Sequence, residues 1–142
     1  MNTPSNRERL AYDEICAYTL SLGDKEFIHQ HVVDAYAAQT ATPSDKPIGL
    51  IFALIGLYLH VEQNYSGKEV QRAHMKLGRQ KRKWPQFQLP TERGEISASM
   101  VVAAQEGPER DNLIHGWCVS VWHAYAGNHA AIEAWAKEWR LV

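Results

Sequence analysis

The stretch PIGLIFALIGLYL, residues 47–59, decides the fold class. It has 13 residues and no charged side chain. A membrane-spanning helix needs about 20 apolar residues, so this stretch is too short to cross a bilayer. Because it is apolar on every side, a helix here belongs in the middle of a protein core. Pro47 suits a first helical turn, with Ser44 or Asp45 as the cap, so we expect a buried central helix over about 46–63.

Helical spacing and end signals recur on both sides of this segment. Gly23 is placed to end a first helix and Asp24 to cap a second one. Ser66 and Glu69 form the S-x-x-E pattern of a capping box. The expected helices lie at about 5–21, 25–40, 46–63, 67–82, 97–106, 108–126 and 129–140. The sequence therefore predicts an all-α, single-domain irregular or orthogonal bundle of about six to seven helices over residues 1–142, with 1–6 frayed.

Composition and charge narrow the class of protein. The chain has 142 residues, of which 45% are hydrophobic and 22% charged, as in one ordinary globular domain. The formal net charge is −1, although residues 66–94 hold eight Lys or Arg against two Glu. The first residues, MNTPSNRERLAYDE, contain no apolar signal segment, so we expect a soluble cytoplasmic protein. Cys16 and Cys118 are expected to be buried free thiols.

Histidines supply the main chemical signal, because the chain has seven of them. The run FIHQHVVDAYAAQT, residues 27–40, contains two histidines and an aspartate. On a helix His29 and His31 point about 200° apart and cannot serve one site. His31 and Asp34 are three residues apart and share a face that also carries Phe27 and Ala38. The spacing therefore favours His31 and Asp34 over His29.

A metal site inside the bundle is our leading hypothesis. His74 lies on an apolar stripe and should point inward, and His60 ends the central helix, where the same turn presents either His60 or Glu62. Helical bundles hold metals with imidazole and carboxylate groups from separate helices. With an open position, such a metal supports hydrolase- or lyase-type chemistry. The predicted ligands of a divalent Zn, Fe, Mn or Ni ion are His31, Asp34, His60, Glu62 and His74.

Other interpretations of the histidines stay open. No pair has a diagnostic metal-binding spacing such as H-E-x-x-H. Buried histidines are often satisfied by backbone carbonyls, in which case the group is structural. His31 and Asp34 are also arranged as a general base with its orienting carboxylate. That interpretation lacks a nucleophile, for which Ser99 and Ser120 are candidates only by default.

The alternative function is a non-enzymatic interaction module with structural histidines. The segment KLGRQKRKW, residues 76–84, has five basic residues in its first eight positions and then a tryptophan. Charge runs are usually solvated helix faces, so we do not expect nucleic-acid binding. A ridge of Trp135 and Trp139 would suit a homodimer through the C-terminal helices. A small-molecule ligand also fits either function, and no membrane partner is expected.

Three stretches also carry a family resemblance. They are YTLSLGDKEFIHQHVVDAYAAQ (18–39), GLYLHVEQNYSGKEVQRAHMKL (56–77) and WPQF (84–87). Together they resemble a family of small bacterial proteins known only as a domain of unknown function. The resemblance covers roughly residues 10–125. It implies membership of that family and brings no activity, cofactor or catalytic residue with it.

Overall fold

The computed structural model describes residues 6–80, 84 and 87–142. These residues form seven α-helices and one 3-10 helix, η1, and none of them lies in a strand. The helices are α1 (Asn6–Ser21), α2 (His29–Thr40), α3 (Pro47–Val61), α4 (Gly67–Gly78), α5 (Ala98–Ala103), α6 (Pro108–Ala124), η1 (Ala126–Asn128) and α7 (His129–Glu138). The predicted all-α fold is confirmed for this part of the chain.

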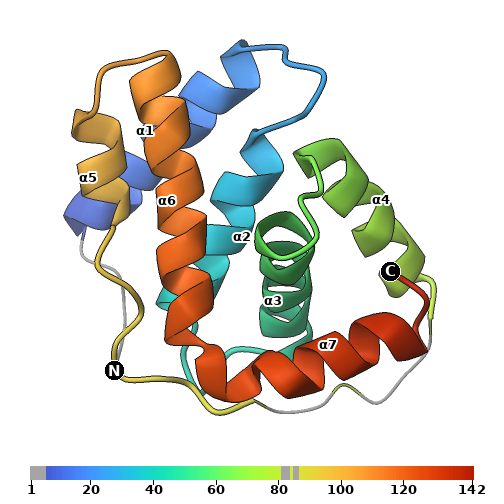
Figure 1. Cartoon of the computed structure of the whole chain (residues 1–142). Coiled ribbons are helices and arrows are strands. Elements are labelled where there is room, and N and C mark those ends of the chain that lie inside the picture. The colour runs from blue at the N-terminus through green and yellow to red at the C-terminus, as the bar shows by residue number, and fades with distance from the viewer. Residues whose placement is uncertain (1–5, 81–83, 85–86) are drawn as a thin grey trace.

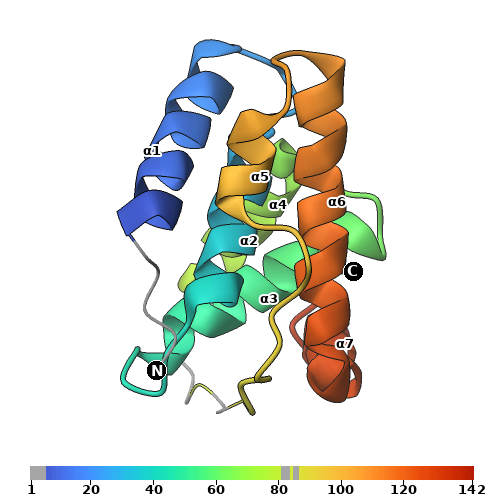
Figure 2. The same cartoon turned by 90° about the vertical axis from the view of Figure 1, so that its left-hand side faces the viewer.

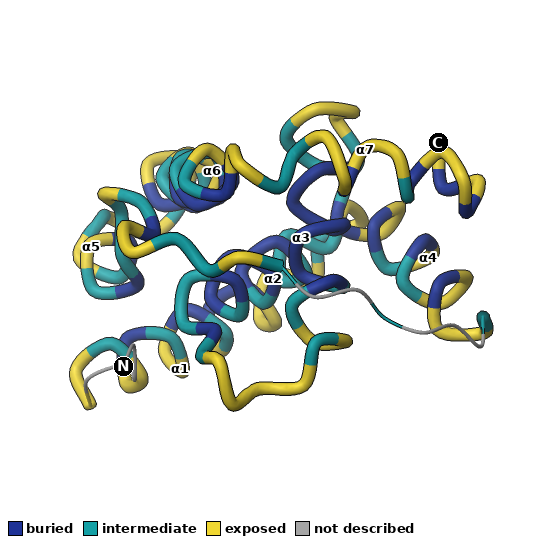
Figure 3. The backbone as a smooth tube through the Cα atoms, turned by 90° about the horizontal axis from the view of Figure 1, so that it is seen from below, coloured by how far each residue is buried: buried dark blue, intermediate teal, exposed yellow. Residues whose placement is uncertain are grey.

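Helix α3 lies in the middle of the bundle, as Figures 1 and 3 show. It packs against α2, α4, α6 and α7, while α2 also contacts α1, α4 and α6. Helix α1 pairs with α5 on one side of the molecule (Figure 2). Helix α7 crosses the lower end of the bundle, and the chain then ends beside α4 (Figure 1).

The central helix has the burial that its sequence predicts. Every residue from Ala53 to Leu59 is buried, so α3 has no solvent face over this stretch. Full burial of a large aliphatic side chain contributes about 1.5–3 kcal/mol to folding. Burial of this apolar segment therefore supplies much of the free energy that stabilises the packing of the other helices around it.

Several predicted helix ends are confirmed. The Glu69 N–H donates to Ser66 Oγ over 3.2 Å, and the Ser66 N–H donates to Glu69 Oε1 over 3.0 Å. These two bonds complete the capping box at the start of α4. Pro47 stands in the first turn of α3, and Gly23 after α1 has the left-handed φ of +59°. Local sequence signals thus set these ends.

The start of α2 differs from the prediction: the helix begins at His29 and not near residue 25. Phe27 has a left-handed φ of +57°, which interrupts a helix. The backbone here is held by α4, because the Lys68 N–H donates to the Glu26 carbonyl over 2.9 Å. A side chain at Gly67 would overlap the Phe27 carbonyl. The backbone conformation of the segment before α2 is therefore set by its contact with α4, a helix distant in sequence.

Other helix ends also differ from the prediction. Helix α4 ends at Gly78, and the end of the predicted helix, Lys81 and Arg82, lies outside the described residues. Helix α5 ends at Ala103, three residues before the predicted end. Helix α6 ends at Ala124, where the chain tightens into η1 before α7. The predicted frayed segment also lies largely outside the described residues, which begin at Asn6.

The buried Arg93 fastens the long connection between α4 and α5 to the core. Its Nη1 donates to the carbonyls of Ala38, Gln39 and Ala41 at 3.3, 3.2 and 2.9 Å, and its Nε donates to Pro90 O over 2.6 Å. These carbonyls include the last ones of α2, which have no partner within the helix. The guanidinium therefore caps α2 and anchors the connection at once.

The tryptophans and cysteines lie mainly in the interior. Trp139 is 4% exposed and Trp135 is half-buried, with stacked rings 5.8 Å apart. Trp139 thus belongs to the core and Trp135 stays partly exposed beside it, while homodimer formation stays a prediction. Cys118 is buried, Cys16 is half-buried, and both are free thiols. Among the described helices, none is long and apolar enough to span a membrane.

Candidate functional site: a histidine-lined pocket

Three histidines from three helices meet beside one pocket. His31 from α2 and His60 from α3 have stacked rings, with centroids 3.5 Å apart and an interplanar angle of 19°. His115 from α6 meets the edge of His60, and its Nδ1 lies 3.1 Å from His60 Nε2. The structure therefore brings together two of the five predicted ligands and adds His115, which the predicted set omits.

Hydrogen bonds define the tautomers of this cluster. His60 Nδ1 lies 3.0 Å from the Tyr65 carbonyl, which can only accept, so Nδ1 carries the hydrogen. The lone pair of His60 is then on Nε2, where it accepts from His115 Nδ1. A carbonyl that fixes one imidazole nitrogen and leaves the other free is the usual support of a metal-binding histidine. His60 is thus oriented with its free nitrogen toward His115.

The turn between α3 and α4 holds that carbonyl in place. Asn64 has a left-handed φ of +58°, a conformation that asparagine tolerates. The Tyr65 N–H donates to Leu59 O over 2.9 Å, and the Tyr65 hydroxyl donates to Leu141 O over 3.0 Å. The capping box follows directly at Ser66. The orientation of His60 therefore depends on a turn fixed at several points.

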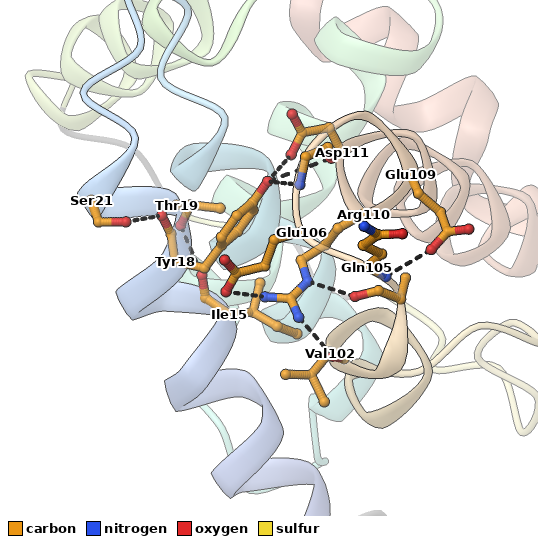
Figure 4. A network of polar contacts seen from close by, with 12 residues as sticks. Ile15, Tyr18, Thr19, Ser21, Val102, Gln105, Glu106, Glu109, Arg110 and Asp111 are labelled. Atoms are coloured by element: carbon orange, nitrogen blue, oxygen red, sulfur yellow. Dashed lines mark hydrogen bonds and ion pairs between the residues drawn. The ribbon is translucent and has the colours of Figure 1, made fainter.

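Three carboxylates line the same pocket, which has a volume of about 290 Å³. They belong to Glu26, Glu69 and Asp111. Asp111 accepts a 2.7 Å hydrogen bond from the Tyr18 hydroxyl, and Figure 4 shows this contact beside the guanidinium of Arg110. Glu69 belongs to the capping box. The pocket thus combines imidazole nitrogens with carboxylates, whose negative charge attracts cations.

Burial keeps two of the histidines neutral. Burial and the neighbouring His60 and His115 lower the pKa of His31 to about 3. Burial also lowers the pKa of His60, although its bond to the Tyr65 carbonyl acts in the opposite direction. Neutral imidazole is the form that binds metals and accepts protons. His31 Nδ1 is buried without a hydrogen-bond partner, which leaves one nitrogen of the cluster unsatisfied.

Asp34 and His74 form a second, separate cluster. Gln30 Nε2 donates to Asp34 Oδ1 over 3.1 Å and lies 3.4 Å from His74 Nδ1. His74 Nε2 donates to the Phe52 carbonyl over 2.7 Å, so both ring nitrogens are engaged. Asp34 Oδ2 is buried and has no partner, and burial raises the pKa of this carboxyl well above its ordinary value. Burial therefore favours the protonated form of Asp34.

The remaining predicted residues lie elsewhere. Glu62 Oε2 accepts from Trp122 Nε1 over 2.8 Å and does not line the histidine pocket. His29 contacts Thr19 Oγ1 over 3.0 Å, away from His31, in line with the helical facing argument. Asp34 pairs with Gln30, one turn earlier on α2, and not with His31. The five predicted ligands are thus divided among three places.

The present side-chain positions do not form a complete metal site. Within the described ranges, no group of three or more His, Cys, Asp or Glu side chains is arranged to hold a metal ion. Sequence reasoning missed His115, which lies on the exposed side of α6. Asp111, four residues earlier on the same helix and in the lining of the same pocket, was the signal that could have indicated it. Only the packing of α6 beside the end of α3 reveals its contact with His60.

Comparison with known proteins places the chain in a family. Residues 9–126 match the family of unknown function DUF5946. The match covers most of the chain, so the protein belongs to this family, as the resemblance of its sequence indicates. No curated protein and no solved structure matches the chain significantly. Function must therefore be argued from the site itself.

Proposed function

We propose that the pocket of His31, His60 and His115 binds a divalent transition-metal ion. The observation that carries this proposal is the 3.1 Å separation between His60 Nε2 and His115 Nδ1. Two nitrogens bonded to zinc at about 2.0–2.1 Å stand roughly 3.0–3.4 Å apart. The pair thus already has the spacing of two ligands of one metal. Binding requires His115 to carry its hydrogen on Nε2, which frees Nδ1.

His31 is the third ligand in this proposal. Its ring now stacks on His60, so it must turn to direct a nitrogen at the metal. This rotation of the His31 ring breaks no hydrogen bond at Nδ1, because that atom has no partner. His31 is also neutral at pH 7, given its pKa of about 3, and needs no deprotonation. A metal would therefore satisfy the nitrogen that the protein alone leaves buried and unpaired.

The chemistry that follows is hydrolase- or lyase-type. A metal held by three histidines keeps an open position, where it activates water at neutral pH. Imidazole ligands suit Zn, Fe and Ni better than Mn, which prefers oxygen donors. The pocket of about 290 Å³ has room for water and a small substrate beside the histidines. Asp34, Glu62 and His74 are not ligands in this proposal, which therefore differs testably from the set predicted from sequence.

Zinc binding to protein prepared without a histidine tag tests the proposal. Calorimetric titration and elemental analysis should show bound metal in the wild type, and zinc should raise its Tm. His60→Ala and His115→Ala should each weaken binding at least tenfold, since each removes a ligand nitrogen. His74→Ala is the matched control, because it removes a buried histidine of the other cluster, and it should keep the wild-type affinity. Equal loss in His74→Ala, or no metal in the wild type, would overturn the proposal.

A non-enzymatic interaction module is the second candidate. It is favoured by two large apolar side chains on the paired helices α1 and α5, since Leu10 is 69% exposed and Met100 is 47% exposed. A contiguous exposed apolar patch is typical of a partner-binding surface, so this alternative requires the two side chains to form one such patch. In that case the histidine cluster is structural. The absence of metal uptake, together with loss of self-association or partner binding in Leu10→Ser, would favour this alternative.

A further inference from the structure

A second hollow adjoins the histidine pocket and shares a wall with it. Its volume is about 270 Å³, against about 290 Å³ for the histidine pocket. Tyr65 and Glu69 line both hollows, so the two hollows lie next to each other on either side of these residues. The lining of the second hollow differs in charge, because it contains the three basic residues Arg72, Lys76 and Arg140.

The basic groups come from two distant segments. Arg72 and Lys76 stand four residues apart on one face of α4, and Arg140 follows α7. Lys76 Nζ donates to the Arg140 carbonyl over 2.6 Å, which joins the two segments. Glu69, the single acidic residue of this lining, is already bound in the capping box. The lining therefore carries an excess of positive charge.

Arg140 occupies a backbone position that normally belongs to glycine. It follows Trp139, the C-cap residue of α7, and has a left-handed φ of +56°. The Leu141 N–H donates to Ala136 O over 2.8 Å. This is the closing pattern of a helix end in which glycine is the usual residue. An arginine here is strained, and it lines the same hollow as Arg72. A strained residue beside a hollow indicates that its side chain has a use there.

We infer that this hollow binds the anionic group, a phosphate or a carboxylate, of the small substrate that reacts in the histidine pocket. The guanidinium groups of Arg72 and Arg140 offer the paired N–H donors that match such oxyanions, and Lys76 adds a third charge. Because Tyr65 and Glu69 line both hollows, an anion bound here lies next to the pocket of His60 and His115. The assignment of this group to a substrate rests on the proposed function. Binding of the anion itself does not rest on the proposed function.

Anion binding is therefore measured in metal-free protein, with chelator present. Inorganic phosphate and acetate are titrated separately, which shows the type of anion that the hollow prefers. Arg72→Gln should weaken binding of the preferred anion at least tenfold. Lys25→Gln removes one exposed positive charge outside the lining and should keep the wild-type affinity. Equal loss in Lys25→Gln, or no loss in Arg72→Gln, would overturn the inference.

Arg140→Gly separates binding from folding. Glycine relieves the left-handed backbone, so the Tm should stay equal or rise, while anion affinity should fall at least tenfold. An unchanged affinity would overturn the inference. A single-stranded oligonucleotide that binds more tightly than either small anion, and is released by the same substitution, would overturn it in favour of nucleic acid. Failure of zinc binding alone would refute the metal site and leave the anion result valid.

Discussion

Asp34 and Gly56 face each other across the contact of α2 with α3 with no room between them. A Cβ at position 56 would overlap Asp34 Oδ2 and come within 3.1 Å of His74 Nε2. Asp34 and His74 can thus occupy their positions only because residue 56, in the middle of a buried helix, is a glycine without a side chain. This relationship makes Gly56 far more sensitive to a small substitution than Gly49, the other glycine of α3.

Gly56→Ala should lower the free energy of unfolding by about 2–4 kcal/mol, because a methyl group has to displace a buried carboxyl. Urea denaturation measures the change. Gly49→Ala is the matched control in the same helix, since a Cβ there meets nothing within 4 Å. Alanine is the better helix former, so Gly49→Ala should be neutral or stabilising by up to about 1 kcal/mol. Similar losses in both variants would contradict the packing argument.

In the wild type, the free energy of unfolding should decrease as the pH rises, and Asp34→Asn should remove this decrease. Burial raises the folded-state pKa of Asp34 above its ordinary 3.8, so above that pH the unfolded chain ionises while the folded protein stays protonated. Stability therefore falls by up to about 1.4 kcal/mol per pH unit until the pH reaches the folded pKa. Asparagine keeps the oxygen that Gln30 binds and does not titrate. Unfolding curves measured between pH 4 and 7 should show the stability of Asp34→Asn rising relative to wild type, and parallel curves would contradict the prediction.

His31 should have the opposite effect on the pH dependence of stability, because it causes a loss of stability as the pH falls. His31→Gln should remove that loss. The folded pKa of about 3 lies below the ordinary 6.5, so the unfolded chain takes up a proton first as the pH falls. Stability due to neutral His31 is thus present above 6.5 and is lost progressively toward pH 3, by up to about 1.4 kcal/mol per unit. Because glutamine does not titrate, the Tm of the His31→Gln variant, measured in chelator, should be less sensitive to acid than that of wild type. An acid transition identical to that of wild type would show that His31 is protonated in the folded state.

Arg93→Ala should destabilise the protein by about 3 kcal/mol or more. It leaves the carbonyls of Gln39 and Ala41 without their common donor, while the Ala38 carbonyl keeps its bond from the Tyr125 hydroxyl, and a buried carbonyl without a partner costs about 1–3 kcal/mol. Arg9→Ala provides the control. Arg9 is exposed and pairs with Asp13 on the surface, so its loss should change stability by less than about 1 kcal/mol. Thermal and chemical denaturation of the two variants should give clearly different midpoints.

The local features of the fold could be predicted from sequence because their causes are local. The apolar run at 47–59, the capping box at Ser66 and the left-handed Gly23 each act within a few residues. The start of α2 could not be predicted, because the left-handed Phe27 is held by the N-terminus of α4. At the start of α2, a tertiary contact overrides the local helix propensity.

The candidate site was predictable only in part for the same reason. Helical spacing separates His29 from His31 correctly, since these side chains contact different helices. Spacing also groups Asp34 with His31, but the Asp34 side chain accepts a bond from Gln30, which also contacts His74. Which residues of other helices meet a given face depends on packing, so the partnership of His60 with His115 had no signal in the sequence.

The bond between the Tyr65 hydroxyl and the Leu141 carbonyl has a consequence for local unfolding. It joins segments 76 residues apart, one holding the carbonyl that orients His60 and the other ending the fold beside α4. Lys76 adds a second tie to the same segment through Arg140. Regions tied in this way open as one cooperative unit. The amides of Tyr65 and Leu141, which donate to Leu59 and Ala136, should therefore exchange with solvent at the same opening free energy. The histidine pocket would then lose its shape only when the end of the chain comes away from the bundle.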